Sequence, residues 1–270
     1  MFEEKFLSLL KKDLQKGASA ERLEHLKCLI KSLQKVVGEE IYITSFCKQP
    51  KDFYTQENGL LSQWRGYGCH GAAAIILNQE DLQNRTEEEG KFYHYPFLGL
   101  KEIVYAFGES EIHEGFHKEI KELIDIGNKF IDAASSRDQK KLNEITYSTY
   151  NPYLTAMTSC KHPSFHEENE VRIIARPIRH DSKLRKAAKE SCTPLDPDQE
   201  KEIHFRSNGH IQIPYIKLFE NLEENLPIER IIIGPQKDQK KQARSLRILL
   251  ENLGLDPDKV TCSETPYTGA

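Results

Sequence analysis

The chain has 270 residues, of which 38% are hydrophobic and 30% are charged, and its formal net charge at pH 7 is −4. This balance is typical of a folded globular protein and excludes an intrinsically disordered one, which has fewer apolar residues and a larger charge imbalance. The small negative charge also excludes a chain-wide basic field for nucleic acid, although local basic patches remain open.

No apolar run approaches the ~20 residues that a membrane span requires. Charged residues interrupt the first ten positions, where a secretory signal would carry its apolar core. We therefore expect a cytoplasmic protein without a membrane partner. The six cysteines include no C-x-x-C pair, which argues against a zinc ribbon and against a dense disulfide framework. We expect reduced thiols, and the sequence defines neither a cofactor nor an oligomeric state.

Apolar residues recur at helical spacing twice within the first forty positions. The first run covers 2–14, the second covers 23–37, and a glycine follows each run. After residue 40 the pattern changes to short β-branched and aromatic runs. We expect an N-terminal helical pair over 1–40, packed on a single α+β domain over 41–270.

Beyond the helical pair, β-branched and aromatic runs predict strands, and longer amphipathic stretches predict helices. The expected strands are 41–46, 71–77, 98–107, 170–176, 203–205, 210–217, 228–233 and 259–263. The expected helices are 59–67, 109–134, 138–158 and 236–253. The remaining segments before residue 58 and over 177–202 are expected to be a polar loop and a charged surface excursion. Unequal helical stretches between strands favour an α+β fold with a mixed, mostly antiparallel sheet and helices packed on it.

Four chemically distinct side chains follow one another in the segment 60–68. Gln63, Trp64, Arg65 and Tyr67 offer an amide, an indole, a guanidinium and a phenol within five residues. Arg65 can bind a carboxylate or a phosphate through two hydrogen bonds, and the aromatic rings can stack on a planar ligand. These groups predict a ligand-binding site. The alternative is structural, with Trp64 as a core anchor and Arg65 in a buried ion pair.

Charged and apolar residues alternate over 168–172. In a strand, Glu168, Glu170 and Arg172 would project from one face, because side chains alternate with period two. Two neighbouring carboxylates raise the pKa of one of them unless a cation such as Arg172 or Arg65 intervenes. Paired glutamates suit general-base catalysis or the binding of a ribose hydroxyl, so Glu168 and Glu170 are the candidate catalytic residues. The alternative is a solvated strand edge with a surface ion pair.

His113 and His117 match H-E-x-x-H, a pattern that places two imidazoles one helical turn apart in zinc peptidases. The charged residues Glu111 and Lys118 flank the motif, and Gly115 inside it weakens a helix. We therefore expect a solvated helix and no bound metal, with a zinc hydrolase as the third-ranked hypothesis.

Two basic stretches occur at 176–189 and 237–247. Neither carries the interleaved aromatic residues on which nucleic-acid bases stack. We expect solvated surfaces there and no nucleic-acid partner.

Six blocks of the chain, in order, resemble the bacterial family catalogued as domain of unknown function twenty-nine seventy-one. These blocks are 42–46, 61–68, 168–172, 213–216, 231–235 and 263–267. The family has no settled activity, so the resemblance implies membership without a mechanism.

Two classes of function stay open. The first is an enzyme-like site for a nucleotide, which resembles an ADP-ribosyltransferase in having Ser45 at a strand and the E-x-E pair formed by Glu168 and Glu170. The second is a non-catalytic binding or regulatory module, in a stress or phage-defence setting. Both expect a small anionic or nucleotide ligand in one cleft. The expected ligand-binding residues are Ser45, Gln63, Trp64, Arg65, Tyr67 and Arg172.

Overall fold

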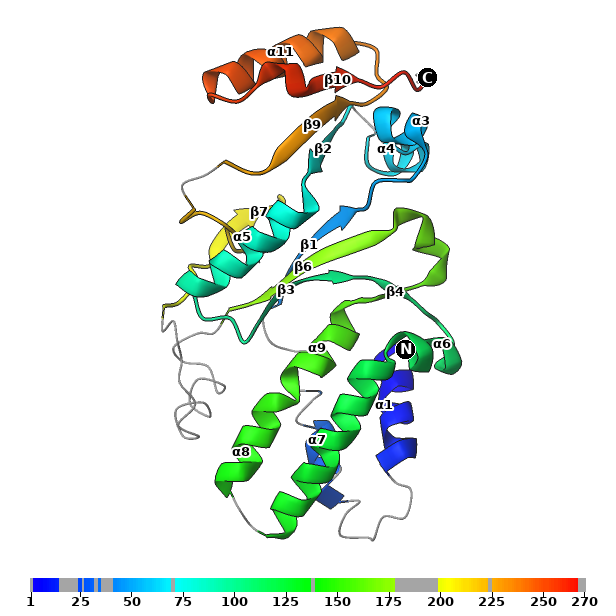
Figure 1. The fold of residues 1–270 in the computed structure, drawn as a ribbon, viewed down its shortest axis with the longest axis vertical. Coiled ribbons are helices and arrows are strands. Elements are labelled where there is room, and N and C mark those ends of the chain that lie inside the picture. Colours follow the sequence, from blue (N-terminus) through cyan, green and yellow to red (C-terminus); the bar gives the residue numbers. More distant parts are fainter. Residues whose placement is uncertain are drawn as a thin grey trace. The chain divides into compact units, whose positions relative to one another are not determined.

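The computed structural model describes residues 2–14, 24–25, 27–31, 34, 41–68, 71–136, 139–177, 199–222 and 225–266. The chain divides into two compact units, which are drawn in Figure 1. The larger unit comprises Met1–Phe46 and Thr86–Asn221, and the smaller unit comprises Cys47–Arg85 and Leu222–Ala270. The N-terminal helix over 2–14 belongs to the larger unit, and the expected boundary at residue 40 stays a prediction.

A three-stranded sheet of order β1-β6-β3 forms the centre of the larger unit. Its strands are β1 (Tyr42–Cys47), β6 (Glu170–Arg176) and β3 (Phe97–Glu102). Strand β6 is central, and all of its residues except Arg172 are buried, including the charged Glu170 and Arg176. Strand β3 pairs antiparallel with β6. The expected strands at 41–46 and 170–176 are confirmed.

Helices form the second layer of the larger unit (Figure 1). They are α1 (Phe2–Leu14), α6 (Glu109–Gly115), α7 (His117–Ser135), α8 (Gln139–Ser148) and α9 (Tyr150–Thr158). Their core contains Phe6, Ile112, Phe116 and Tyr153, none of which is more than 1% exposed. Helix α9 also covers the central sheet, since its Leu154 packs in one cluster with side chains of β3 and β6.

The long helix expected at 109–134 is interrupted at Phe116, which ends α6 and caps the start of α7. The break allows a close approach at Gly115, where an added Cβ would lie 2.3 Å from Cγ1 of Val104. The helix expected at 138–158 is likewise divided into α8 and α9. Of the second N-terminal helix, only parts of 24–34 are described, and these are helical.

Short elements complete the larger unit. Strand β4 (Val104–Tyr105) pairs in parallel with β5 (Cys160–Lys161), and the 3₁₀ helix η1 (Pro163–Glu168) follows. The expected hairpin is confirmed as β7 (His204–Ser207) and β8 (Gln212–Tyr215), which pair antiparallel. Most of the expected excursion at 177–202 lies outside the described residues.

The smaller unit is built on a sheet of order β10-β9-β2. Its strands are β2 (Ala73–Leu77), β9 (Ile228–Ile233) and β10 (Val260–Cys262). Its helices are α3 (Phe53–Asn58), α4 (Leu61–Tyr67), α11 (Gln239–Asn252) and the 3₁₀ helix η2 (Pro257–Lys259). Helix α11 lies along the sheet in Figure 1, and its Ala243 and Leu250 pack on Ile231, Ile233 and Val260.

Two helices were not expected. Helix α3 replaces part of the expected polar loop, because the side chain of Asp52 caps it by accepting a hydrogen bond from the backbone N–H of Thr55. Helix α5 (Gln79–Phe92) has almost no apolar face, and its buried positions include Thr86 and Glu89. The overall fold class is nevertheless as expected, an α+β chain with mixed, mostly antiparallel sheets.

Candidate functional site

The candidate site residues divide between the two units. Ser45, Glu168, Glu170 and Arg172 belong to the larger unit. Gln63, Trp64, Arg65 and Tyr67 belong to the smaller unit. The expectation that both sets line one cleft stays a prediction, and each set is therefore considered within its own unit.

Glu170 is the centre of a charged network in the larger unit, and its side chain is only 3% exposed. The guanidinium of Arg172 donates to both carboxylate oxygens, at 2.7 Å from Nε and 3.2 Å from Nη2. The Nζ of Lys161 donates to the same carboxylate at 2.9 Å. Both oxygens of Glu170 are thus held by cations, which is the arrangement a buried carboxylate requires.

Lys161 on β5 joins the two glutamates. Its Nζ lies 2.5 Å from Oε2 of Glu168 as well as 2.9 Å from Oε2 of Glu170. Burial would lower the pKa of Lys161, but the hydrogen bonds to the two carboxylates outweigh it, so the pKa is raised. The sequence suggested Arg172 or Arg65 as the cation between the glutamates. Arg172 does fill this role for Glu170, and Lys161 fills it for both.

Ser45 reaches the network from the neighbouring strand β1 and donates a hydrogen bond to Glu170. Burial would raise the pKa of Glu170, but the hydrogen bonds from Arg172, Ser45 and Lys161 outweigh it and lower the pKa to about 2. Ser45 is exposed, unlike the other donors. Ser45 is therefore the hydrogen-bond donor of this network that is open to a ligand. We call Ser45, Lys161, Glu168, Glu170 and Arg172 the Glu170 cluster.

Glu168 reaches this cluster by a different route from the expected one. It ends the 3₁₀ helix η1 and precedes the strand, so alternation along a strand does not align it with Glu170. Asn169 between them has a left-handed backbone, with φ 42°, which asparagine tolerates better than most residues. This turn redirects the chain, and Lys161 brings the two carboxylates together.

Neutral groups also form hydrogen bonds with residues of the cluster. The backbone N–H of Glu170 donates to the hydroxyl of Tyr105 at 2.7 Å, and Nη1 of Arg172 donates to the carbonyl of Thr158 at 2.5 Å. The ring of Phe165 is half exposed and lies 5.0 Å from the Nζ of Lys161. An aromatic surface is thus available beside the charges.

Trp64 in the smaller unit is a core anchor. It is 9% exposed, and its Nε1–H donates to the carbonyl of Asn58 at 2.9 Å. The backbone at Gly59 and Gly234 packs directly on its ring, since an added Cβ would lie 2.5 Å and 2.8 Å from it, respectively. The contacts of Trp64 within this unit therefore fit the alternative in which it is a core anchor.

The other three side chains of this segment differ from Trp64. Arg65 and Tyr67 are exposed, and Gln63 is partly exposed. Within the described residues, Arg65 makes no ion pair, so the alternative of a buried structural pair does not hold for it. These groups are available to a ligand, and their role stays a prediction.

His113 and His117 lie on either side of the break at Phe116, in α6 and α7 respectively. Their ring centroids are 6.0 Å apart. Among the residues that the structure describes, no group of three or more His, Cys, Asp or Glu side chains could hold a metal ion. In the same part of the chain, no helix has the length and apolarity needed to cross a bilayer.

These features define an α+β protein whose central strand carries a buried, charge-compensated glutamate. Residues 63–173 match a family model described as protein of unknown function (DUF2971), which confirms the resemblance found in the sequence. This segment, less than half of the chain, contains all of the Glu170 cluster except Ser45. No curated protein and no solved structure matches the sequence.

Two members of the site were not expected from the sequence, Lys161 and Tyr105. Both belong to the two-residue strands β4 and β5, which are too short for a period-two pattern to be recognised. The only local signal is that Lys161 precedes the E-x-E pair by seven residues. Lys161 can pair with the two glutamates because the 3₁₀ helix η1 turns the chain back toward it.

Proposed function

We propose that the Glu170 cluster handles a nucleotide in the manner of an ADP-ribosyltransferase. The observation that carries this proposal is the hydrogen bond from Ser45 on β1 to Glu170 on the neighbouring strand β6. It links the two sequence features on which the likeness rests, a serine on a strand and the second glutamate of an E-x-E pair.

The low pKa of Glu170 suits one particular role. With a pKa of about 2, the group is a carboxylate at neutral pH and is a poor general base, since a base works best with a pKa near the working pH. A permanent carboxylate can accept a hydrogen bond from a ribose hydroxyl and stabilise positive charge that develops on the sugar ring. The exposed Ser45 beside it is open to a ligand hydroxyl.

The reaction that these groups would support is transfer of the ADP-ribosyl group from nicotinamide adenine dinucleotide. The bond between ribose C1′ and the nicotinamide nitrogen breaks, and its electron pair goes to that nitrogen. A nucleophile on the acceptor bonds to C1′ and gives its proton to Glu168, whose side chain is more exposed than that of Glu170, at 17% against 3%. Glu168 has first to separate from Lys161.

The surroundings of the two carboxylates also suit a nucleotide. Lys161 and Arg172 are cations that can bind phosphate oxygens. Phe165 offers a half-exposed ring beside Lys161, on which a base can stack. The formal charge of −4 on the chain disfavours a long polyanion such as duplex DNA.

The second candidate function is binding without turnover, and a specific observation favours it. Arg172 holds both oxygens of Glu170, and Lys161 holds one of them again. A carboxylate occupied in this way can fix the geometry of a binding site without taking part in a reaction. This is the non-catalytic or regulatory alternative.

Two measurements on the full chain separate these functions. A thermal-shift panel of nucleotides, with duplex DNA as the comparison, tests binding, and release of nicotinamide from nicotinamide adenine dinucleotide tests turnover. We expect stabilisation by a nucleotide that Ser45→Ala and Glu170→Gln lose and that Glu167→Gln keeps, because Glu167 is an exposed neighbour outside the cluster. Binding without nicotinamide release supports the second function. If duplex DNA binds and no nucleotide does, both are wrong.

A further inference from the structure

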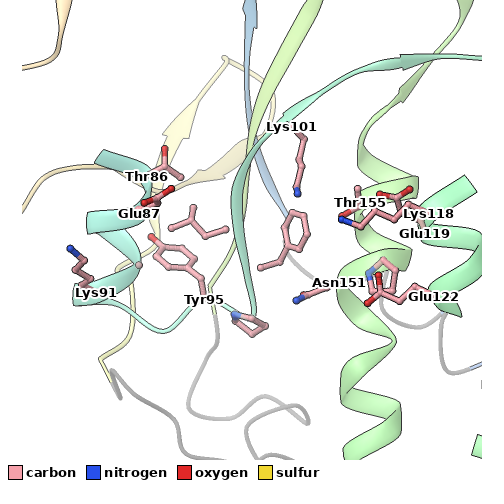
Figure 2. A pocket seen from close by; sticks show the side chains of 15 residues that line it. Thr86, Glu87, Lys91, Tyr95, Lys101, Lys118, Glu119, Glu122, Asn151 and Thr155 are labelled. Carbon is pink, nitrogen blue, oxygen red and sulfur yellow. The ribbon is translucent and has the colours of Figure 1, made fainter. Parts of the chain in front are cut away.

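A cavity of about 570 Å³ lies in the larger unit, beside the edge strand β3 (Figure 2). Its walls come from α5, β3, α7, α9 and the segment before β3. Small-molecule sites are typically cavities of roughly 300–1,000 Å³ formed between elements, and this one has a suitable size. None of its residues belongs to the Glu170 cluster.

Lys101 on β3 extends into this cavity in Figure 2. In the antiparallel register, Lys101 lies directly opposite Arg172 of β6, so the two cations share one face of the sheet. Like charges opposite each other destabilise a sheet unless each is compensated. Arg172 is compensated by Glu170, at 2.7 Å, but Lys101 has no hydrogen bond or ion pair within the described residues.

Lys101 is partly exposed, so its ammonium group can meet a ligand in the cavity. Two further lysines line the same cavity, Lys91 from α5 and Lys118 from α7. In the described part of the chain, neither of them makes an ion pair. Lys101 from β3 and Lys118 from α7 therefore line one space that an anion could occupy, whereas the side chain of Lys91 points away from its centre (Figure 2).

The other residues that line the cavity limit which anions it can bind. Glu119 and Glu122 of α7 also face the cavity, as Figure 2 shows, and they would repel an extended polyanion. They can accept hydrogen bonds from an amine on the ligand. Asn151 and Thr155 of α9 add neutral hydrogen-bonding groups.

We propose that this cavity binds a small organic molecule that carries an anionic group, phosphate or carboxylate, together with an amine. Lys101 and Lys118 bind the anionic group, and Glu119 and Glu122 bind the amine. The site is separate from the Glu170 cluster, and the proposal does not depend on nucleotide handling. Lys101 of this site lies opposite Arg172, so it is on the same face of the sheet as that member of the cluster.

Calorimetric titration of the full chain at low ionic strength tests the site with three probes. O-phosphoserine carries phosphate and amine, aspartate carries carboxylate and amine, and inorganic phosphate has no amine. We expect one of the first two to bind with a dissociation constant of about 1 mM or tighter, and inorganic phosphate to bind at least about tenfold more weakly. The stronger of the two amine-bearing probes identifies the anionic group.

Variants assign the binding to this cavity. Lys101→Gln should weaken the binding of the best probe about tenfold or more, because it removes a charge-assisted contact. Glu119→Gln should weaken an amine-bearing probe and leave inorganic phosphate unweakened. Lys129→Gln is the matched control, since Lys129 is an exposed lysine farther along α7 and does not line the cavity. A thermal melt of each variant confirms that it is folded.

Three results would overturn the proposal. The first is the absence of measurable binding of either amine-bearing probe to the wild-type chain at concentrations up to about 10 mM. The second is a folded Lys101→Gln variant that binds as tightly as the wild type. The third is a Lys129→Gln variant that loses as much affinity as Lys101→Gln. The last of these would indicate general attraction of anions to surface lysines.

Discussion

The guanidinium of Arg172 holds both oxygens of the Glu170 carboxylate, two residues before it on the same strand, through Nε at 2.7 Å and Nη2 at 3.2 Å. Neighbours at this spacing share one face of a strand, so the pairing needs no long-range contact. Of the remaining groups around Glu170, Lys161 lies 9 residues earlier in the chain, on another strand, and Ser45 comes from a distant part of the sequence. The network therefore depends both on the local geometry of the strand and on the tertiary fold.

Acid should remove a defined part of the stability of the larger unit. The pKa of Glu170 is lowered from 4.5 to about 2 in the folded chain, so its contribution is present above pH 4.5 and is lost as the pH falls toward 2. The shift corresponds to roughly 3 kcal/mol. Urea unfolding between pH 2 and 7 should show that the wild type and Glu170→Gln differ in free energy of unfolding. This difference should shrink as the pH falls from 4.5 toward 2.

Glu167→Gln is the control for this measurement, because Glu167 is exposed and lies outside the Glu170 cluster. Its unfolding free energy should differ little from that of the wild type at every pH. A gap between wild type and Glu170→Gln that stays constant from pH 7 to pH 2 would contradict the assignment of the charge network.

Removal of the buried ammonium of Lys201 should destabilise the larger unit strongly. Its Nζ lies 2.9 Å from Oε1 of Glu89 and 2.9 Å from Oε1 of Glu220, and the side chains of Lys201 and Glu89 are fully buried. Lys201→Met would leave the carboxylate of Glu89 buried without its cation, at a cost of about 3 kcal/mol or more. Chemical denaturation measures this change, with the exposed Lys217→Met as control. Equal stability of the two variants would refute it.

The long regular strands were predictable, because their side chains alone encode burial. The bounds of strand β6 match the expected ones, because its β-branched residues Val171, Ile173 and Ile174 favour a strand and are buried in it. Helix α5 was not predictable in this way. Its fully buried Glu89 is stabilised by Lys201, which lies more than a hundred residues later, so no apolar periodicity marks the buried face.

The candidate site shows the same limit. Glu170 and Arg172 were identified because they lie on one strand, where local spacing determines their geometry. Lys161 was missed because its position beside Glu168 depends on the 3₁₀ helix η1 and the left-handed turn at Asn169. The residues that line the cavity beside β3 come from four elements and share no sequence pattern, so only the fold brings them together.

Cys160 should react slowly with alkylating reagents. Burial raises the pKa of its thiol to about 11, so little reactive thiolate exists at pH 8. Cys28 is exposed and serves as the internal comparison. Iodoacetamide labelling of the native chain, followed by peptide mass spectrometry, should modify Cys28 much earlier than Cys160. Equal rates under native conditions would show that Cys160 is more accessible than its packing indicates.

The single tryptophan makes the packing of the smaller unit directly testable. In Gly234→Ala, the added Cβ would lie 2.8 Å from the ring of Trp64 and 3.1 Å from the carbonyl oxygen of Ala72, so both must shift. Such overpacking costs about 1–3 kcal/mol. In Gly66→Ala, by contrast, the added Cβ meets nothing within 4 Å on helix α4, and replacing a helical glycine should stabilise by about 0.5–1 kcal/mol. Unfolding followed by Trp64 fluorescence reports on this unit, and the two glycine variants should move its midpoint in opposite directions. A midpoint that Gly234→Ala leaves unchanged or raises would mean that Gly234 is not held against the indole ring.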